Sequence, residues 1–157
     1  EQLQILSLEI QRMPKNPQHE FGHLWEYPRR SVCTISTHDM ATLRGWWEED
    51  MELTSRYYNH VLGNWGEVPA TAPAEICEEI VRQHLYSPSL LAILTFQDWL
   101  SMDADIRYPD ANAERINVPA NPRHYWRYRM HLTIEELMKS KNFNEKLTSM
   151  INETRRY

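Results

Sequence analysis

Long hydrophobic runs are missing from this chain of 157 residues, which also contains only 4 glycines and 2 cysteines. The longest apolar run, Leu90–Leu94, is far short of the roughly 18 to 20 residues that a membrane-spanning helix needs. The sequence has no glycine-rich phosphate loop, no C-x-x-C pair and no G-x-S-x-G elbow. We therefore expect no membrane partner and no cofactor, and nucleotide-binding, thiol-redox and serine-hydrolase functions have no support.

Basic residues are in the minority. The chain has 17 Lys and Arg residues and 22 Asp and Glu residues, and the resulting formal net charge of −5 opposes binding to nucleic acid. The two cysteines, Cys33 and Cys77, fall in apolar periodic segments, where a free thiol behaves as a small hydrophobic group. These features predict a globular protein of a reducing, cytoplasmic compartment with no nucleic-acid partner.

Three segments have the pattern of β-strands. Apolar residues alternate with polar ones from Leu6 to Ile10, and Pro14 ends this pattern. The segment Ser31–Thr37 is rich in β-branched residues, which favours a second strand. The apolar run Leu90–Phe96 predicts a parallel strand buried on both faces, with a short buried helix as the alternative.

Helical spacing appears between and after these strands. We expect a helix from Trp47 to Leu62 and another that starts at Pro73 and stops before Pro88. Two capping boxes, Thr133 with Glu136 and Asn142 with Glu145, predict two terminal helices.

The order of strands and helices predicts an α/β fold with about three parallel strands. A complete (β/α)8 barrel takes about 250 residues, so this chain can hold at most its closing part. We therefore expect one helix-rich unit over 1–157, with barrel elements in 1–132 and terminal helices in 133–157. The chain opens at Glu1 without an initiator Met, which favours a processed chain or a piece of a longer protein.

The clearest candidate site is Ser36-Thr37-His38-Asp39, at the end of the second predicted strand. Side chains at the carboxyl ends of parallel strands reach the ligand cleft in α/β proteins. The alternative is that His38 and Asp39 only cap a turn or the following helix.

Two other clusters have alternative interpretations. His19 and His23 fit the H-E-x-x-H pattern of zinc peptidases, but nearby prolines and Gly22 oppose the helix that this site needs, so we expect no metal. The segment Arg123–Arg129 interleaves arginines with aromatic residues, which suits a carbohydrate cleft or simple packing at a strand-to-helix corner. Gly45-Trp46-Trp47 allows the same two interpretations, a carbohydrate cleft or simple packing.

Four segments together resemble the amylomaltases, which are 4-α-glucanotransferases of the α-amylase clan. They are Ser36–Trp47, Gln97-Asp98, Glu114–Pro119 and His124–Arg129. Pro119-Ala120-Asn121 and Tyr125-Trp126 depart from the common family form. These departures are similar to the subgroup that contains the plant cytosolic disproportionating enzyme and its bacterial relatives.

The resemblance implies a retaining (β/α)8 transglycosylase that moves α-1,4-glucan segments from a donor to a glucose or oligosaccharide acceptor. Its nucleophile and general acid/base, about 5 Å apart, would precede this segment. Asp39 would be the catalytic residue that remains, and the residues implied to bind substrate are His38, Arg44, Trp46, Gln97 and Asn117.

This chain alone would then be inactive, and its unclosed sheet favours self-association. A non-catalytic carbohydrate-binding or interaction module is the second hypothesis, and a zinc peptidase built on His19 and His23 is the third.

Overall fold

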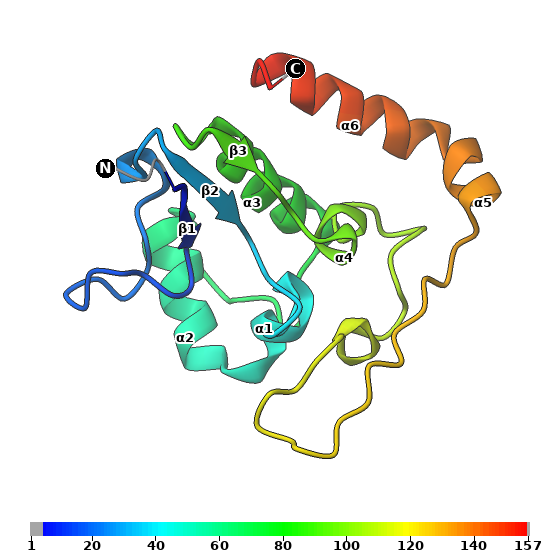
Figure 1. The fold of residues 1–157 in the computed structure, drawn as a ribbon, viewed down its shortest axis with the longest axis horizontal. Helices are drawn as coiled ribbons and strands as arrows, with labels where there is room; N and C mark the ends of the chain where they lie inside the picture. Colours follow the sequence, from blue (N-terminus) through cyan, green and yellow to red (C-terminus); the bar gives the residue numbers. More distant parts are fainter. Residues whose placement is uncertain (1–4, 157) are drawn as a thin grey trace.

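The strands form one parallel three-stranded sheet, which lies on the side of the molecule away from α5 (Ile134–Lys139) (Figure 1). The computed structural model describes residues 5–156. The strands are β1 (Ser7–Ile10), β2 (Ser31–Thr34) and β3 (Leu91–Ala92), in the order β1-β2-β3. Both pairs are parallel, which confirms the predicted α/β class and strand direction. The predicted ends of the unit, at residues 1 and 157, lie outside the described residues.

Helices follow the second and third strands. They are α1 (Leu43–Glu49), α2 (Met51–Arg56), α3 (Ala74–Tyr86), α4 (Phe96–Leu100), α5 (Ile134–Lys139) and α6 (Lys141–Glu153). The π-helix η2 (Tyr57–Val61) continues α2, and two short 3-10 helices are η1 (Leu24–Glu26), between β1 and β2, and η3 (Ala111–Glu114). In the part of the chain that the structure describes, no helix is long and apolar enough to cross a membrane.

The helix predicted to run from Trp47 to Leu62 has the wrong start and is not continuous. It begins at Leu43, because the Thr42 hydroxyl caps the first turn by accepting a hydrogen bond from the Gly45 N–H. It breaks at Asp50, whose carboxylate accepts backbone N–H bonds and so starts α2. Apolar spacing predicted helical structure in this region, but it gave neither the caps nor the break between the two helices.

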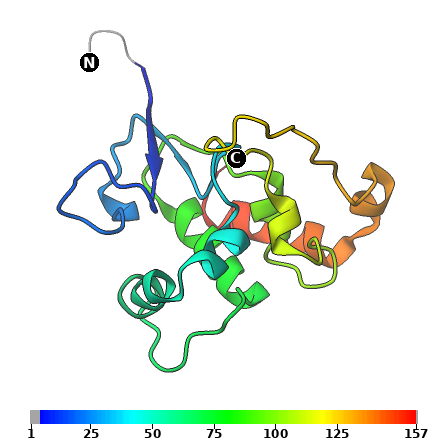
Figure 2. The ribbon, with the colours of Figure 1, turned by 90° about the horizontal axis from the view of Figure 1, so that it is seen from below.

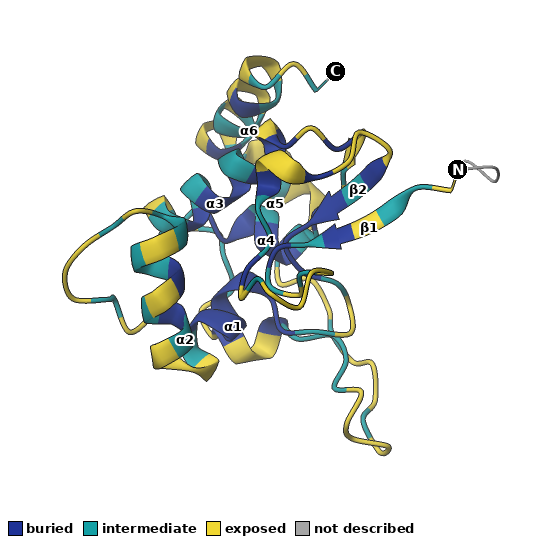
Figure 3. Ribbon diagram, turned by 90° about the vertical axis from the view of Figure 1, so that its left-hand side faces the viewer, coloured by how far each residue is buried: buried dark blue, intermediate teal, exposed yellow. Residues whose placement is uncertain are grey.

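The two faces of the sheet differ in how they are covered. Cys33 of β2 faces α3, and its sulfur lies 3.5 Å from the carbonyl oxygen of His84. The opposite face carries a row of paired residues, Leu8, Val32 and Leu91. Leu8 is 48% exposed and Leu91 is 43% exposed, so this apolar face is open (Figure 3).

The prediction of a strand buried on both faces over Leu90–Phe96 is wrong. β3 contains two residues and pairs only with β2, so it is an edge strand. Leu90, Leu91 and Ile93 are exposed, and α4 already begins at Phe96. The apolar run does contribute Leu94 to the core.

The two terminal helices are present. The capping box of Thr133 and Glu136 is complete, which confirms the start of α5. The second predicted box is wrong, because α6 starts at Lys141 and Asn142 lies within the helix. Phe143 and Met150 of α6 are buried in the main core, and α6 packs against α3.

A buried histidine lies in the helical layer. His84 of α3 is 1% exposed, and its Nδ1 lies 2.8 Å from the carbonyl oxygen of Ile80. Burial lowers the pKa of His84 to about 4, although the Ile80 carbonyl opposes this shift. The core therefore holds this imidazole in its neutral form at neutral pH.

This pKa predicts an acid-dependent loss of stability. Between the ordinary pKa of 6.5 and about 4, the unfolded chain binds more protons at His84 than the folded chain, so the free energy of unfolding should fall as pH is lowered. The loss from this group should reach about 3 kcal/mol at the acid end of that window. Denaturant unfolding across this pH range measures it. His84→Gln should reduce the change of the unfolding free energy with pH, and the control His60→Gln, at an exposed position, should not. An unchanged pH dependence in His84→Gln would contradict the assignment of this effect to His84.

Candidate functional site

The turn after β2 brings three of the predicted site residues together. The side chains of His38 and Asp39 are 55% and 53% exposed, and the His38 Nε2 lies 3.2 Å from the Asp39 Oδ2. The Asn117 side-chain amide donates a hydrogen bond of 2.7 Å to the Asp39 Oδ1. The Trp126 ring lies against His38, with 5.2 Å between ring centroids. An accessible carboxylate is therefore held between an amide and an imidazole.

A buried carboxylate, Asp98 of α4, ties down both ends of this turn. The Ser36 hydroxyl donates to the Asp98 Oδ2, and the Leu43 N–H donates to the Asp98 Oδ1 over 2.9 Å. Asp98 has no exposed surface. Because carboxylate bonds to N–H and O–H groups are strong in a buried setting, Asp98 fixes where the turn leaves β2 and where α1 begins.

A buried guanidinium, Arg12, holds the same turn from the other side. One nitrogen, Nη2, donates to the carbonyl oxygens of Ile35 and Ala41, each over 3.0 Å. Its guanidinium carbon lies 5.0 Å from the centre of the Trp46 ring. Burial lowers the pKa of Arg12, and the nearby Asp98 carboxylate opposes that effect. Arg12 thus links the end of β1 to the turn after β2.

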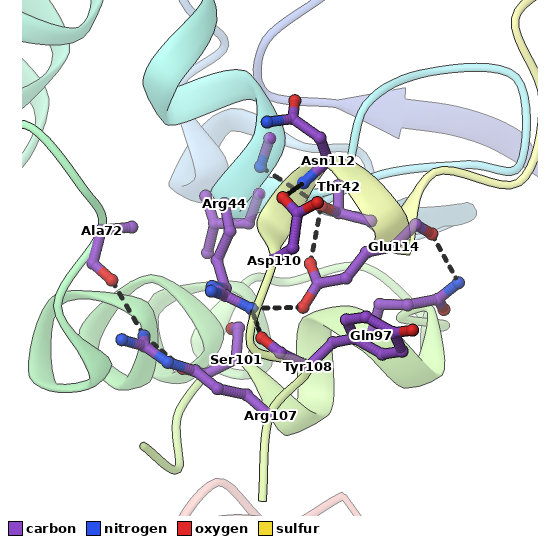
Figure 4. A network of polar contacts seen from close by, with 12 residues as sticks. Thr42, Arg44, Ala72, Gln97, Ser101, Arg107, Tyr108, Asp110, Asn112 and Glu114 are labelled. Carbon is purple, nitrogen blue, oxygen red and sulfur yellow. Dashed lines mark hydrogen bonds and ion pairs between the residues drawn. The ribbon is translucent and has the colours of Figure 1, made fainter. Parts of the chain in front are cut away.

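A second buried carboxylate, Glu114, joins η3 to the start of α1 (Figure 4). The Arg44 Nη1 lies 2.5 Å from the Glu114 Oε1, and the Thr42 hydroxyl donates to the Glu114 Oε2 over 2.9 Å. Gln97 donates to the Glu114 backbone carbonyl over 3.1 Å. Burial raises the pKa of Glu114, while Arg44 and Thr42 oppose the shift. This network positions the segment that carries Asn117.

The predicted site residues therefore fall into two layers. His38, Asp39 and Asn117 form the accessible cluster. Arg44, Trp46 and Gln97 are buried: Arg44 and Gln97 contact Glu114, and Trp46 packs against Phe21, Tyr57 and Arg12. These three residues are at most 9% exposed, so they belong to the interior and not to the accessible cluster.

Sequence reasoning missed three charged residues that position the turn. They are Arg12, Asp98 and Glu114. Asp98 and Glu114 stand in segments that carry the family resemblance, but their spacing does not reveal their partners. No local pattern marks Arg12, which follows the alternating strand β1 after Gln11.

The histidine pair and the arginine-rich aromatic segment that the sequence singled out lie in different settings. His19 and His23 lie in an irregular segment, as expected, with their rings 4.7 Å apart. Among residues 5–156, no group of three or more His, Cys, Asp or Glu side chains is arranged to hold a metal ion. In the segment 123–129, Tyr125 is 71% exposed and Trp126 is 58% exposed, so these rings do not pack into a strand-to-helix corner.

The family model and the two relatives named next share one description, 4-alpha-glucanotransferase. Residues 1–133 match the model of glycoside hydrolase family 77, described as 4-alpha-glucanotransferase. The 4-alpha-glucanotransferase DPE2 of Oryza sativa subsp. japonica is 40% identical over 151 residues, which are 96% of this chain and 16% of the relative. The 4-alpha-glucanotransferase of Aquifex aeolicus is 30% identical over 117 residues, covering 74% of this chain and 21% of the relative.

A solved structure has a similar fold. The amylomaltase from Streptococcus agalactiae in complex with acarbose matches with a TM-score of 0.67 and 19% identity, covering 97% of this chain and 28% of that one. The chain thus spans less than a third of the length of each of these three relatives.

The role of Asp98 can be tested by its removal. Asp98→Ala should lower the free energy of unfolding by about 3 kcal/mol or more, because it leaves buried donors at Ser36 and Leu43 without an acceptor. Denaturant unfolding at neutral pH measures the loss. Asp105→Ala, at an exposed position, is the matched control, and equal losses in the two variants would show that Asp98 does not anchor the turn.

Proposed function

The chain belongs to the 4-alpha-glucanotransferases of glycoside hydrolase family 77, and from this premise we propose that it forms the C-terminal part of a (β/α)8 barrel that transfers α-1,4-glucan segments. The accessible Asp39 carboxylate, held by Asn117 at the carboxyl edge of the sheet, is the observation that carries this proposal. Donors are α-1,4-glucans and acceptors are glucose or oligosaccharides.

The open face of the sheet supports a barrel. Leu8, Val32 and Leu91 lie in one row on the face away from α3, and the two leucines are exposed. In a (β/α)8 barrel the inward side chains of all strands fill one common interior. In this proposal, further strands of a longer polypeptide therefore cover this row of residues.

The chemistry requires more carboxylates than Asp39. A retaining transglycosylase uses a nucleophile and a general acid/base about 5 Å apart, with a covalent glycosyl-enzyme intermediate. The proposal assigns both to the longer polypeptide. Asp39 then binds sugar hydroxyls and favours the distorted, oxocarbenium-like ring of the transition state.

The contacts of Asp39 suit this role. A carboxylate accepts about four hydrogen bonds. The Asn117 amide uses one position on Oδ1, and the His38 Nε2 lies 3.2 Å from Oδ2. The remaining positions can accept sugar hydroxyls. His38 and the exposed Trp126 ring beside it offer a hydrogen-bonding group and an apolar face for the same sugar.

The buried residues have a supporting part in the proposal. Arg44 and Gln97 fix Glu114, and Trp46 packs under Arg12. We assign them a positioning role, in which they hold the accessible cluster in a geometry that binds sugar. The buried free thiols Cys33 and Cys77 remain in keeping with the predicted cytoplasmic location.

Asp39→Asn tests the central assignment. In a longer polypeptide that contains this chain, the variant should lower kcat at least about a hundredfold, because it removes a charge used chiefly in the transition state. Its folding should be nearly unchanged, since Asp39 is exposed. Glucan transfer assays measure kcat for this variant and for the control Asp105→Asn. Near-normal turnover in Asp39→Asn would exclude the transition-state role of Asp39.

The 157-residue chain alone should not transfer glucans, because Asp39 cannot replace two carboxylates that flank the bond. Its open sheet face and edge strands should also drive self-association. Chromatography of maltotriose reactions and light scattering measure these properties, with a species above 18.8 kDa expected. Transfer that is lost on mutating a carboxylate of this chain would contradict the first expectation, and a strict monomer would contradict the second.

A further inference from the structure

A hollow lined by basic and aromatic residues lies between η3 and the segment 124–129. It encloses about 330 Å³. Figures 1 and 2 show the chain running from η3 (yellow) to α5 (orange) along the outside of the molecule, with no helix or strand between them. Tyr125 and Arg127 line the hollow, whereas Trp126, between them in sequence, packs against His38. The hollow and the accessible cluster at Asp39 therefore share this segment but not their lining residues.

The ionisable side chains of opposite sign are unevenly distributed here. Arg115, Arg127 and Arg129 line the hollow together with His124, and no Asp or Glu of residues 5–156 lines it. The Arg115 Nη1 lies 3.0 Å from the Glu49 Oε1, so this charge is balanced. Neither Arg127 nor Arg129 forms an ion pair within the described chain. Two guanidinium charges without a counter-charge thus lie at one hollow, in a chain whose net charge is −5.

Three tyrosines add hydrogen-bond donors to this lining. They are Tyr108, Tyr125 and Tyr128. The Arg127 guanidinium carbon lies 5.1 Å from the centre of the Tyr125 ring. A guanidinium that stacks on a ring keeps the N–H groups at its edge available for an anion. Tyrosine hydroxyls can donate to the same anion. The donors and the charges of this lining therefore favour a negatively charged ligand.

The two sides of the hollow are held by contacts of their own. On one side, the His124 Nε2 lies 2.9 Å from the Ile116 carbonyl oxygen, which can only accept a hydrogen bond. On the other side, the Tyr108 ring packs edge-on against the His131 ring, with 4.7 Å between centroids. These contacts connect distant positions of an otherwise irregular segment. Such preorganisation lowers the entropic cost of binding.

We propose that this hollow binds a small phosphate-bearing ligand, whose phosphate oxygens accept hydrogen bonds from Arg127 and Arg129. A phosphate monoester carries about −1.5 to −2 charge at neutral pH, which balances two guanidinium groups, whereas one carboxylate balances only one. The paired N–H groups of arginine also fit the spacing of phosphate oxygens. The volume of about 330 Å³ is near the lower limit for ligand pockets, so the hollow suits a small molecule and not a polymer.

Isothermal titration calorimetry of the 157-residue chain with glucose 6-phosphate tests this site. Glucose 6-phosphate should bind, and uncharged glucose should not displace it. Arg127→Ala and Arg129→Ala should each weaken binding about tenfold, because each removes a charge-assisted contact to phosphate. Arg127→Lys should keep part of the affinity, since it retains the charge but not the paired N–H groups. Near-ultraviolet circular dichroism checks that each variant keeps the fold.

Inorganic phosphate, used as a competitor, identifies the part of the ligand that the site recognises. Competition at equal concentration would show that the phosphate group alone is bound. Weaker competition would show that the esterified group contributes, and either result supports the site.

Arg30→Ala is the matched control, because Arg30 is an exposed arginine outside the lining and its loss changes the net charge equally. This variant should bind glucose 6-phosphate like the unmodified chain. An equal loss of affinity in Arg30→Ala would reduce the effect to overall charge and overturn the site. Undiminished binding by the Arg127→Ala, Arg129→Ala double variant, or no binding by the folded unmodified chain, would also overturn it.

Discussion

The buried carboxylate of Asp98 is the group on which the geometry of the candidate site depends. It accepts hydrogen bonds from Ser36, where the chain leaves β2, and from Leu43, where α1 begins. Arg12 holds the carbonyls of Ile35 and Ala41 in the same turn. Both oxygens of Asp98 are bonded, and another conformation of the turn would leave this buried carboxylate without its donors, so the turn has few alternative conformations. Asp39 is thus exposed to solvent on a segment whose backbone is held from below.

Glu114 extends this frame to a distant part of the chain. It binds Arg44 and Thr42 at the start of α1, which lie 70 and 72 positions away in sequence. The segment around Asn117 has little regular structure, so its position depends on such side-chain bonds. The contact between Asn117 and Asp39, over 2.7 Å, is a consequence of that frame.

Local patterns predicted what depends on local interactions. Alternation located β1, β-branched residues located β2, and the capping box located α5. The motif at the end of β2 identified His38 and Asp39 before any contact was known. The accessible partner Asn117 came from the family resemblance, because no local pattern connects it to Asp39.

Other features depend on partners far along the chain, and there the sequence was insufficient. Apolar content could not reveal that Leu90, Leu91 and Ile93 lie at an uncovered edge rather than between two layers. Spacing could not show that Arg44 and Gln97 meet Glu114 in the interior. Buried polar pairs are non-local, so a single sequence gives their members but not their pairing.

A crystal structure of a longer polypeptide that contains this chain, with a maltooligosaccharide bound, tests the account most directly. The account predicts a sugar hydroxyl within hydrogen-bond distance of the Asp39 carboxylate. It also predicts that Asp98 and Glu114 keep their present partners beneath the sugar and do not touch it. A maltooligosaccharide that contacts Asp98 or Glu114 directly, or that leaves Asp39 in solvent, would contradict the account.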